Sequence, residues 1–233
     1  MASVLELSEL AFRWPSADVR ILEIDEFSIP RSKHTFLMGA SGSGKSTLLN
    51  LVSGVLTAEH GSAKIDGADI QGLSSKMRDR LRAEKIGYIF QQFNLIPYLS
   101  AIENVLLSCR FSPARAAAAQ QRHGSQRDSA LSLLTGFFPN QNLDFDRAVT
   151  ALSVGQQQRV AAARALIGAP SLVIADEPTS ALDHDTKARF MELLVQESDR
   201  QNSTLLFVSH DPTLTNHFHR MIRIEDINSA VIG

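Results

Sequence analysis

The first thirty residues contain two segments in which apolar and polar residues alternate. Residues 4–12 and 20–29 both follow this period of two, and residues 14–18 between them have the composition of a turn. Such alternation is typical of half-buried strands, because successive side chains of a strand point to opposite faces of the sheet. The pattern predicts two strands, the second returning alongside the first.

Short apolar runs without helical periodicity predict buried strands further along the chain. They lie at residues 34–38, 86–90, 172–175, 204–208 and 221–224, and residues 64–67 look like a strand followed by a turn. Helical segments are expected between them, at residues 47–52, 74–83 and 186–201. The last of these places Phe190, Leu193 and Leu194 on one face. Strands that alternate with helices indicate an α/β fold with a mainly parallel core sheet.

The character of the sequence changes in the middle of the chain. From Ser100 to about Ala169 it is mostly helical and has few β-branched runs. We interpret residues 93–155 as a helical subdomain inserted into an α/β domain. Residues 1–92 and 156–233 would then form the catalytic lobe of a single domain that spans residues 1–233.

Composition and charge fit an ordinary globular protein of 233 residues, with 44% hydrophobic and 21% charged residues. A net charge of −2 lacks the basic excess of a nucleic-acid-binding surface, so we expect no nucleic-acid partner. Cys109 is the only cysteine, which excludes an intrachain disulfide and favours a buried thiol. Neither a signal peptide nor a stretch long enough to span a bilayer is recognisable. We therefore expect that any membrane role needs a separate membrane partner.

Eight consecutive residues after the run at 34–38 match the phosphate-binding loop pattern in full: Gly39, Ala40, Ser41, Gly42, Ser43, Gly44, Lys45 and Ser46. Glycines let the backbone turn its N–H groups toward phosphate oxygens, and the helix that continues through Thr47 adds its positive N-terminus. Lys45 supplies charge to the β- and γ-phosphates, and the Ser46 hydroxyl is a Mg²⁺ ligand. The loop predicts ATP and Mg²⁺, whereas a chance Gly/Ser loop would lack the flanking strand and helix.

Two carboxylates, Asp176 and Glu177, follow directly after the apolar run at 172–175. A buried strand does not usually end in two acidic residues without a use for them. Asp176 suits a position beside Mg²⁺, and Glu177 suits the general base that polarises an attacking water. The alternative is a pair of acidic residues that cap a helix. We predict that the chain hydrolyses ATP.

The segment 152–159, with the sequence Leu-Ser-Val-Gly-Gln-Gln-Gln-Arg, is the most diagnostic stretch. On its own it predicts only a helix capped by Ser153. With the motifs on either side, it resembles the signature motif of ATP-binding cassette (ABC) proteins. Other positions match that family's motifs in the family's order, namely Trp14, Gln91, Ser180-Ala181-Leu182-Asp183 and His210. The resemblance covers essentially the whole chain and implies an ABC-type P-loop NTPase with an antiparallel β-subdomain and an inserted α-helical subdomain.

The resemblance implies roles within one subunit for three of these residues. Gln91 would contact Mg²⁺ or the lytic water, unless Gln91 and Gln92 are only polar loop residues. His210 would contact the γ-phosphate and stabilise the transition state. Trp14 would stack on adenine, with Phe12 as a nearby competitor. The remaining histidines are expected at the surface, among them His34, His60 and His217.

The resemblance also implies that two copies of the chain share each nucleotide. Ser153, Gly155 and Gln156 would bind ATP held by the opposite subunit, and Asp183 would couple the two sites. A homodimer that closes around two ATP molecules follows. Val154 stands where the family usually has a second glycine, and its branched side chain could alter closure of the dimer.

The sequence of residues 86–97 resembles that of the lipoprotein-release and macrolide-export group of ABC ATPases. That group implies a permease partner, export or mechanical transmission, and a peripheral position at the cytoplasmic face of a bacterial inner membrane. Phe93, Leu95 and Tyr98 would receive a helix of the permease, or else belong to the core. The alternatives are the ATPase of an importer, a regulator of cell-wall remodelling, and a soluble ABC ATPase acting on ribosomes or DNA. Four dispersed arginines are expected to form a solvated helix face or to contact lipid headgroups: Arg110, Arg115, Arg122 and Arg127.

Overall fold

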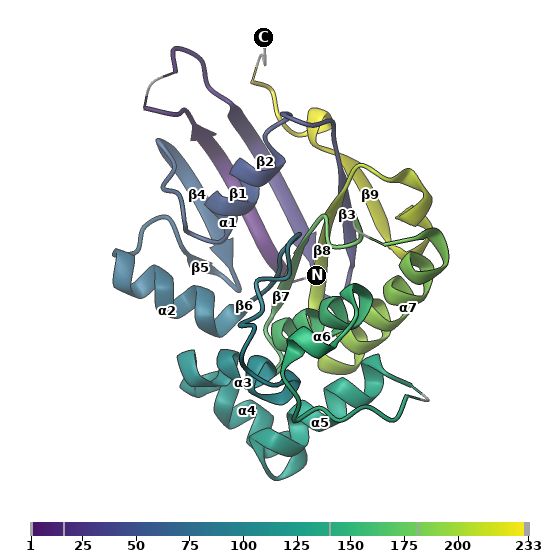
Figure 1. The fold of residues 1–233 in the computed structure, drawn as a ribbon. Coiled ribbons are helices and arrows are strands. Elements are labelled where there is room, and N and C mark those ends of the chain that lie inside the picture. Colours follow the sequence, from purple (N-terminus) through teal and green to yellow (C-terminus); the bar gives the residue numbers. More distant parts are fainter. Residues whose placement is uncertain (1, 16, 140, 181, 231–233) are drawn as a thin grey trace.

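The computed structural model describes residues 2–15, 17–139, 141–180 and 182–230, and it contains two sheets and a group of helices (Figure 1). The predicted turn at 14–18 includes Ser16, which lies outside the described residues. Among the described residues, no helix combines the length and the apolar composition that a membrane crossing requires.

The central sheet has five parallel strands in the order β6-β7-β8-β3-β9. These strands are β3 (Thr35–Met38), β6 (Ile86–Ile89), β7 (Leu172–Asp176), β8 (Thr204–Ser209) and β9 (Arg220–Arg223). Apolar residues occupy both faces, which is why the sequence shows continuous apolar runs here instead of alternation. The predicted parallel core is confirmed, with β9 starting one residue earlier than the run at 221–224 indicates.

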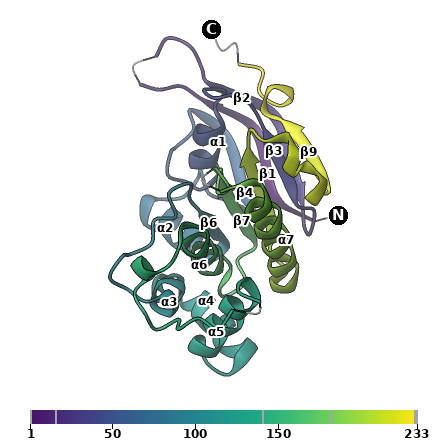
Figure 2. The same ribbon diagram turned by 45° about the vertical axis from the view of Figure 1, so that its right-hand side comes forward.

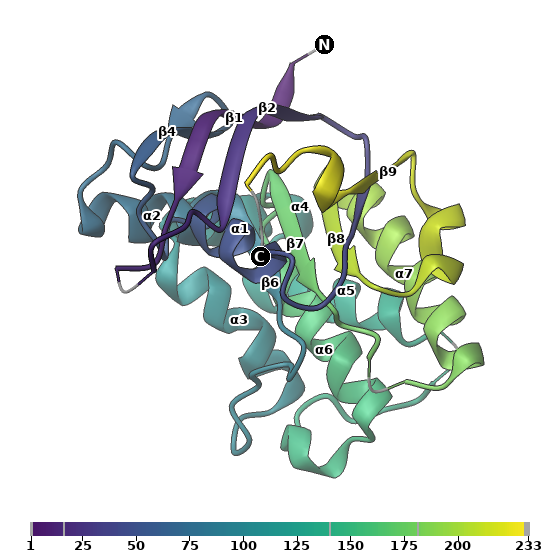
Figure 3. The same ribbon diagram turned by 90° about the horizontal axis from the view of Figure 1, so that it is seen from above.

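The second sheet is antiparallel and has the order β2-β1-β4-β5. Its strands are β1 (Ser3–Phe12), β2 (Leu22–Pro30), β4 (His60–Ile65) and β5 (Ala68–Asp69). The strand and turn expected at residues 64–67 are confirmed, because β4 ends at Ile65 and Asp66 and Gly67, with positive φ angles of 51° and 78°, form the turn into β5. The short helix α1 (Lys45–Val52) lies between the two sheets (Figure 3). Its leucines and Val52 fill one core cluster together with residues of both sheets.

Helices cover the other face of the parallel sheet. They are α6 (Val154–Leu166) and α7 (His184–Gln201), and Phe36, Val173 and Phe207 of the sheet share a core cluster with them. A group of shorter helices extends away from the sheets (Figure 2): α3 (Ala101–Phe111), α4 (Pro113–His123) and α5 (Gln126–Phe137). Another α-helix, α2 (Ser75–Lys85), precedes β6.

Serines begin the short helices of the middle segment. Ser100 forms a capping box with Glu103, while the side chains of Ser112 and Ser125 accept hydrogen bonds from the first turns of α4 and α5. Each such cap satisfies a backbone N–H that has no partner inside its helix and is worth about 1 kcal/mol. The helical character expected for the middle of the chain is therefore specified by local sequence.

Arg115 does not belong to a solvated helix face, so that expectation is wrong for this residue. Its side chain is buried, and its Nε donates to the Ile167 carbonyl at 2.7 Å while Nη2 donates to the Ala165 carbonyl at 2.6 Å. These carbonyls lie at the end of α6, where a helix leaves acceptors without partners. Arg115 therefore attaches α4 to the end of α6, a role that charge alone does not reveal.

His34 is also buried, contrary to the expectation of a surface position. It precedes β3, and its Nδ1 accepts the Leu205 N–H at 3.1 Å while its Nε2 lies 3.0 Å from an Asp199 carboxylate oxygen. A ring that accepts at Nδ1 and donates at Nε2 is neutral. Burial lowers the pKa of His34 despite the opposing charge of Asp199, and His219 at a ring distance of 5.5 Å lowers it further.

We expect the free energy of unfolding to decrease as the pH is lowered, because His34 becomes protonated. Since its folded pKa lies below the ordinary value of 6.5, its contribution is complete above that pH and is lost as the pH falls through the folded pKa. Urea midpoints at pH 7.5 and 5.0 measure the difference. His34→Asn, which keeps an acceptor for the Leu205 N–H, should show a smaller acid loss, and His60→Asn should match the unmodified protein. An unchanged acid loss in His34→Asn would contradict the assignment.

Candidate functional site

The candidate site lies at the carboxyl edge of the parallel sheet, where open α/β folds bind ligands. β3 leads into the loop from Gly39 to Ser46, and β7 ends at Asp176. Gln91 follows β6 after one residue, and His210 follows β8 directly. Four neighbouring strands thus deliver to one edge the residues that are far apart in sequence.

The phosphate-binding loop has the backbone that its glycines predict. Gly42 and Gly44 adopt φ angles of 83° and 93°, which residues with side chains rarely adopt. A Cβ atom on Gly39 would lie 2.5 Å from Ile224 Cγ2. Lys45 begins α1, is buried, and donates its ammonium group to the carbonyls of Gly39 at 2.8 Å and Ala40 at 2.6 Å. The loop is therefore held closed around a positive charge at a helix N-terminus, an arrangement suited to an anion.

One cavity of about 410 Å³ brings half of the predicted site residues together. It is lined by Ile21, Ser41, Gly42, Gly44, Lys45, Ser46, Thr47, Gln91, Asp176 and Glu177. Of the loop residues that do not line this cavity, Ser43 donates its hydroxyl to the Ala40 carbonyl at 2.8 Å. The loop, the β7 carboxylates and Gln91 thus surround a single space.

Asp176 and Glu177 differ in their surroundings although they are adjacent. Burial raises the pKa of Asp176, and the charge of Glu177 adds to this, while a hydrogen bond from the Tyr88 hydroxyl and the charge of Lys45 oppose it. The Tyr88 oxygen lies 3.5 Å from Asp176 Oδ2. Burial and the same carboxylate raise the pKa of Tyr88, which keeps its proton for donation. Asp176 is therefore a carboxylate that a nearby cation would stabilise.

Glu177 has an unusual backbone conformation at the end of β7. Its φ is 43°, and its N–H donates to the Val208 carbonyl at 2.9 Å. A positive φ on a residue with a side chain costs on the order of 1 kcal/mol or more and is commonest at functional sites. One oxygen of its carboxylate lies 3.2 Å from His210 Nδ1, and the His210 side chain is 65% exposed. The pair reaches from the cavity wall toward solvent.

Three oxygen donors around the cavity match the preferences of Mg²⁺. The Ser46 hydroxyl, the Gln91 amide oxygen and the Asp176 carboxylate line the same cavity. Mg²⁺ takes hard oxygen ligands, uses one or two carboxylates, and fills its other positions with water and substrate phosphates. The residues present fit such an ion.

The signature residues do not line this cavity. Ser153 caps α6, because its Oγ accepts the Gln156 N–H at 3.3 Å and its own N–H donates to Gln156 Oε1 at 2.9 Å. Val154, the first residue of the helix, is 51% exposed. The Asp183 side chain caps α7 by accepting the Thr186 N–H, and its hydrogen bonds with Thr186 lower its pKa. Ala181 lies outside the described residues.

Trp14 and Phe12 are distinguished by their exposure. Phe12 is buried, whereas Trp14 is 41% exposed and packs edge-on against Phe12 with ring centroids 5.0 Å apart. Trp14 is therefore the member of the pair with a free ring face, although it does not line the cavity of the phosphate loop. Its stacking role stays a prediction.

Sequence reasoning missed two residues of the site. Ile21 lines the cavity from the residue before β2, and no motif marks it. Tyr88 bonds Asp176 from the neighbouring strand β6. Its polar hydroxyl within an otherwise apolar run was the available signal.

Phe93, Leu95 and Tyr98 have different environments. Leu95 packs against the core and Phe93 is half-buried, whereas Tyr98 is 79% exposed. Phe93 and Asn94 both adopt positive φ angles, 58° and 47°, and Arg164 of α6 donates to both of their carbonyls at 2.6 Å. This turn follows Gln91, whose amide donates to the Ser180 hydroxyl at 3.4 Å.

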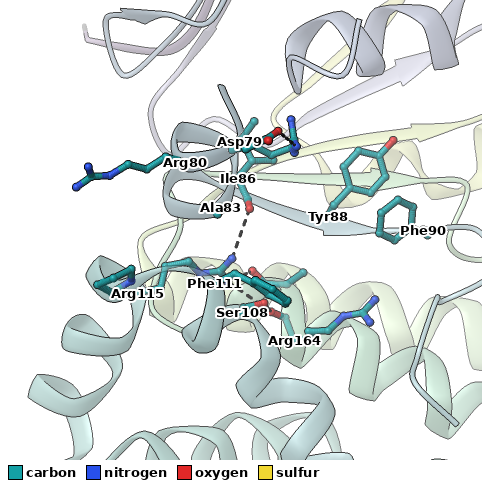
Figure 4. A pocket seen from close by; sticks show the side chains of 13 residues that line it. Asp79, Arg80, Ala83, Ile86, Tyr88, Phe90, Ser108, Phe111, Arg115 and Arg164 are labelled. Carbon is teal, nitrogen blue, oxygen red and sulfur yellow. Dashed lines mark hydrogen bonds and ion pairs between the residues drawn. The ribbon is translucent and has the colours of Figure 1, made fainter. Parts of the chain in front are cut away.

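A second cavity, of about 640 Å³, forms a groove between α2 and β6 on one side and α3, α4 and α6 on the other (Figure 4). We call it the interlobe groove. Its apolar lining includes Ile86, Tyr88, Phe90 and Phe111, and its charged lining is Asp79, Arg80, Arg82, Arg115 and Arg164. Phe111 is 74% exposed, which is unusual for a large aromatic residue.

Comparison with known proteins places this geometry in a family. The model of the family described as ABC transporter matches residues 22–180. The chain is 36% identical over 225 residues to the macrolide export ATP-binding/permease protein MacB of Syntrophobacter fumaroxidans, a match that covers 96% of this chain and 30% of that protein. It is 34% identical over 208 residues to the bacitracin export ATP-binding protein BceA of Halalkalibacterium halodurans, covering 88% and 78% of the two chains.

A solved structure agrees with the sequence relatives. It is a dimeric, post-hydrolysis state of the ATP-binding cassette MJ0796 bound to ADP and Pi, with a TM-score of 0.77 and 32% sequence identity. The match covers 94% of this chain and 93% of that one. The fold, the family match and these relatives together show that the chain belongs to the ABC transporter family and is an ATPase of the ATP-binding cassette type.

Proposed function

We propose that the chain is the ATPase subunit of a membrane complex for export or mechanical transmission, and that two copies share each ATP. One observation supports the proposal that two copies share each ATP. The phosphate loop, Gln91 and the β7 carboxylates line one cavity, whereas the capped N-terminus of α6 does not line it. An exposed helix N-terminus in an ATPase is suited to a phosphate that a second copy presents.

Within one copy, different residues bind the phosphates, bind Mg²⁺ and activate the attacking water. Lys45 and the loop N–H groups bind the phosphates, and Ser46, Gln91 and Asp176 hold Mg²⁺, which supplies charge neutralisation when it is bound. Glu177 accepts a proton from the attacking water, and its neighbour His210 donates a hydrogen bond to the γ-phosphate. Trp14 stacks on the adenine. The raised pKa of Asp176 supports this arrangement, because a carboxylate in such a site gains from a cation.

Gly155 supports the shared site because neither its backbone conformation nor its contacts within one chain require a glycine. A Cβ atom there would meet Thr186 Cγ2 at 3.5 Å and Leu182 Cδ2 at 3.7 Å, which are ordinary contacts. Gly155 also lacks the positive φ that would require glycine. A glycine inside a helix costs roughly 0.5–1 kcal/mol relative to alanine. We infer that the close approach of a second copy with its nucleotide, in a homodimer, is what requires a glycine here.

Gly155→Ala should therefore separate stability from activity. We expect the free energy of unfolding to rise by roughly 0.5–1 kcal/mol, because alanine favours the helix. ATP hydrolysis should fall about tenfold, a barrier increase near 1.4 kcal/mol, because the methyl group faces the second copy. Urea denaturation and phosphate release measure the two effects. Two other glycines do not provide a matched control. A Cβ atom on Gly136 would lie 2.3 Å from Glu197, and Gly124, which is exposed at the end of α4, has a φ of 83° that disfavours alanine. Ala118→Gly on α4 supplies the reverse helix change away from the site, and full activity in Gly155→Ala would contradict the proposal.

The partner we propose is an integral-membrane permease, with the chain bound peripherally at the cytoplasmic face of a bacterial inner membrane. The names of the relatives, which include export and permease functions, support this partner. The docking surface comprises the interlobe groove and the adjoining segment with Phe93, Leu95 and Tyr98. The groove exposes apolar side chains, among them Phe111, which suits an amphipathic helix.

Purification of the tagged chain from membranes in mild detergent tests the partner. We expect a stoichiometric membrane-spanning protein with a large extracytoplasmic domain, whose presence changes the rate of ATP hydrolysis. Recovery with ribosomes or DNA, and with no membrane protein, would overturn the proposal. The copy number of the chain in the purified complex tests the homodimer at the same time.

A further inference from the structure

The interlobe groove contains an unbalanced set of charges. Its charged lining consists of four arginines and one aspartate, and that aspartate, Asp79, already pairs with Arg82 at 2.5 Å. Arg115 is occupied by backbone carbonyls at the end of α6. Arg164 and the exposed Arg80 remain as cations of the groove lining without a carboxylate partner among the described residues, and the Arg80 side chain points outward (Figure 4).

Arg164 is the more informative of these two cations. It is half-buried, and burial lowers its pKa to about 10 with no opposing effect from any carboxylate. Its two hydrogen bonds go to the neutral carbonyls of Phe93 and Asn94. A guanidinium binds a carboxylate more strongly than a carbonyl, since its planar fork matches both carboxylate oxygens. Arg164 is therefore a partly desolvated cation whose best partner is missing from its own chain.

The present partners of Arg164 lie beside the nucleotide site. Phe93 and Asn94 follow Gln91 by two and three residues, and both have positive φ angles that strain the backbone of residues with side chains. Turn hydrogen bonds accompany them, from the Phe93 N–H to the Phe90 carbonyl at 3.1 Å and from the Asn94 N–H to the Gln92 carbonyl at 2.6 Å. The two bonds from Arg164 hold this strained turn in place. If Arg164 is withdrawn, the turn next to Gln91 is free to relax.

We propose that Arg164 receives a carboxylate from the docking segment of the membrane partner, and that it exchanges the carbonyls of Phe93 and Asn94 for that carboxylate. The occupant of the groove is an amphipathic helix with its apolar face against Phe90 and Phe111 and one Asp or Glu directed at Arg164. Charge complementarity and the exposed aromatic residues select this occupant. Docking is thereby transmitted to Gln91 through one side chain. The inference rests on the proposed membrane partner and adds the chemistry of recognition.

Zero-length cross-linking tests the recognition. Arg164→Lys keeps the charge and supplies an amine, which a carbodiimide joins to a contacting carboxylate with loss of water to the reagent. The substituted chain is purified with its membrane partner, treated, digested and mapped by mass spectrometry. We expect a link from position 164 to an Asp or Glu of a membrane-spanning protein, at several times the yield obtained with Arg80→Lys. A link to a second copy of the chain, or equal yields from both variants, would overturn the inference.

Amide hydrogen exchange, measured on the chain without its membrane partner, tests whether Arg164 stabilises the turn at Phe93 and Asn94. Arg164→Gln removes the guanidinium, and we expect exchange at Phe93 and Asn94 to accelerate tenfold or more. Arg164→Lys should give a smaller change, and Arg80→Gln none. Circular dichroism confirms that α6 remains folded, and Arg164→Lys covers the case in which Arg164→Gln does not fold. Unchanged exchange in Arg164→Gln would overturn the coupling to Gln91.

The outcomes separate this inference from the proposed function. If the unmodified chain captures no membrane protein, the permease proposal fails, and the inference fails with it. If the complex forms but Arg164→Gln binds the membrane partner as tightly as the unmodified chain, only the role of Arg164 fails. We expect its affinity to fall tenfold or more, because loss of one member of a desolvated ion pair leaves the other unpaired.

Discussion

Glu177→Gln is expected to lower the rate of ATP hydrolysis by about 10²–10⁴-fold, the range that a general base contributes. Glutamine has the same shape and can still contact His210, which lies 3.2 Å from the Glu177 carboxylate. It cannot accept a proton from water at neutral pH. The affinity for ATP should change little, because the phosphate loop and Lys45 are untouched. Single-turnover hydrolysis and equilibrium binding of ATP measure the two effects separately.

Glu192→Gln is the matched control for this variant. Glu192 lies on an exposed part of α7, so the same chemical change occurs away from the cavity. It should hydrolyse ATP at the unmodified rate. A Glu177→Gln protein that retained more than about a third of the unmodified rate would assign the base to another group.

Lys45→Ala is expected to weaken ATP binding by about 100-fold, which corresponds to roughly 2.7 kcal/mol. The ammonium group is buried and held by the carbonyls of Gly39 and Ala40, so it is positioned before the nucleotide arrives. Loss of a charge-assisted bond to phosphate in such a position is worth about 1.5–3 kcal/mol. Equilibrium dialysis or calorimetry with Mg·ATP gives the dissociation constant.

Lys76→Ala, at an exposed position of α2, is the control for removal of one positive charge. Its ATP affinity should match that of the unmodified chain. The melting temperature of Lys45→Ala without nucleotide shows whether the loop itself has collapsed. An unchanged ATP affinity in a folded Lys45→Ala protein would refute the role of this residue.

The sequence predicts the core of this fold well because its signals are local and strong. Apolar runs such as 204–208 are typical of strands in a sheet covered on both faces, and the structure places this run in the middle of five parallel strands. Ser153, which the sequence predicts as a helix cap, is the N-cap of α6. The strand and turn at residues 64–67 are also predicted, whereas the start of β4 at His60 and its pairing with β5 are not.

The candidate site was predictable where a motif fixes both residue type and spacing. The loop from Gly39 to Ser46 and the acidic end of β7 lie together because parallel strands bring their carboxyl ends to one edge. Ile21 lines this cavity and Tyr88 contacts Asp176 from elements that carry no motif, so only the packed structure reveals them.

Buried polar residues were the least predictable part. His34 and Arg115 are charged or polar by type, and the sequence alone suggests that such residues face solvent. Each is buried because it satisfies backbone groups, the Leu205 N–H in one case and carbonyls at the end of α6 in the other. Such bonds depend on which elements meet, which periodicity does not encode.

A mixing experiment tests the shared nucleotide site most directly. Lys45→Ala inactivates the phosphate loop, and Gly155→Asp places a negative charge where the partner's phosphates would approach; each variant alone should be inactive. Mixed in equal amounts, they should regain about a quarter of the unmodified rate, because half of the dimers are mixed and each mixed dimer has one complete site out of two. If the mixture remains as inactive as its components, or if Gly155→Asp alone is fully active, the site is not shared between two copies.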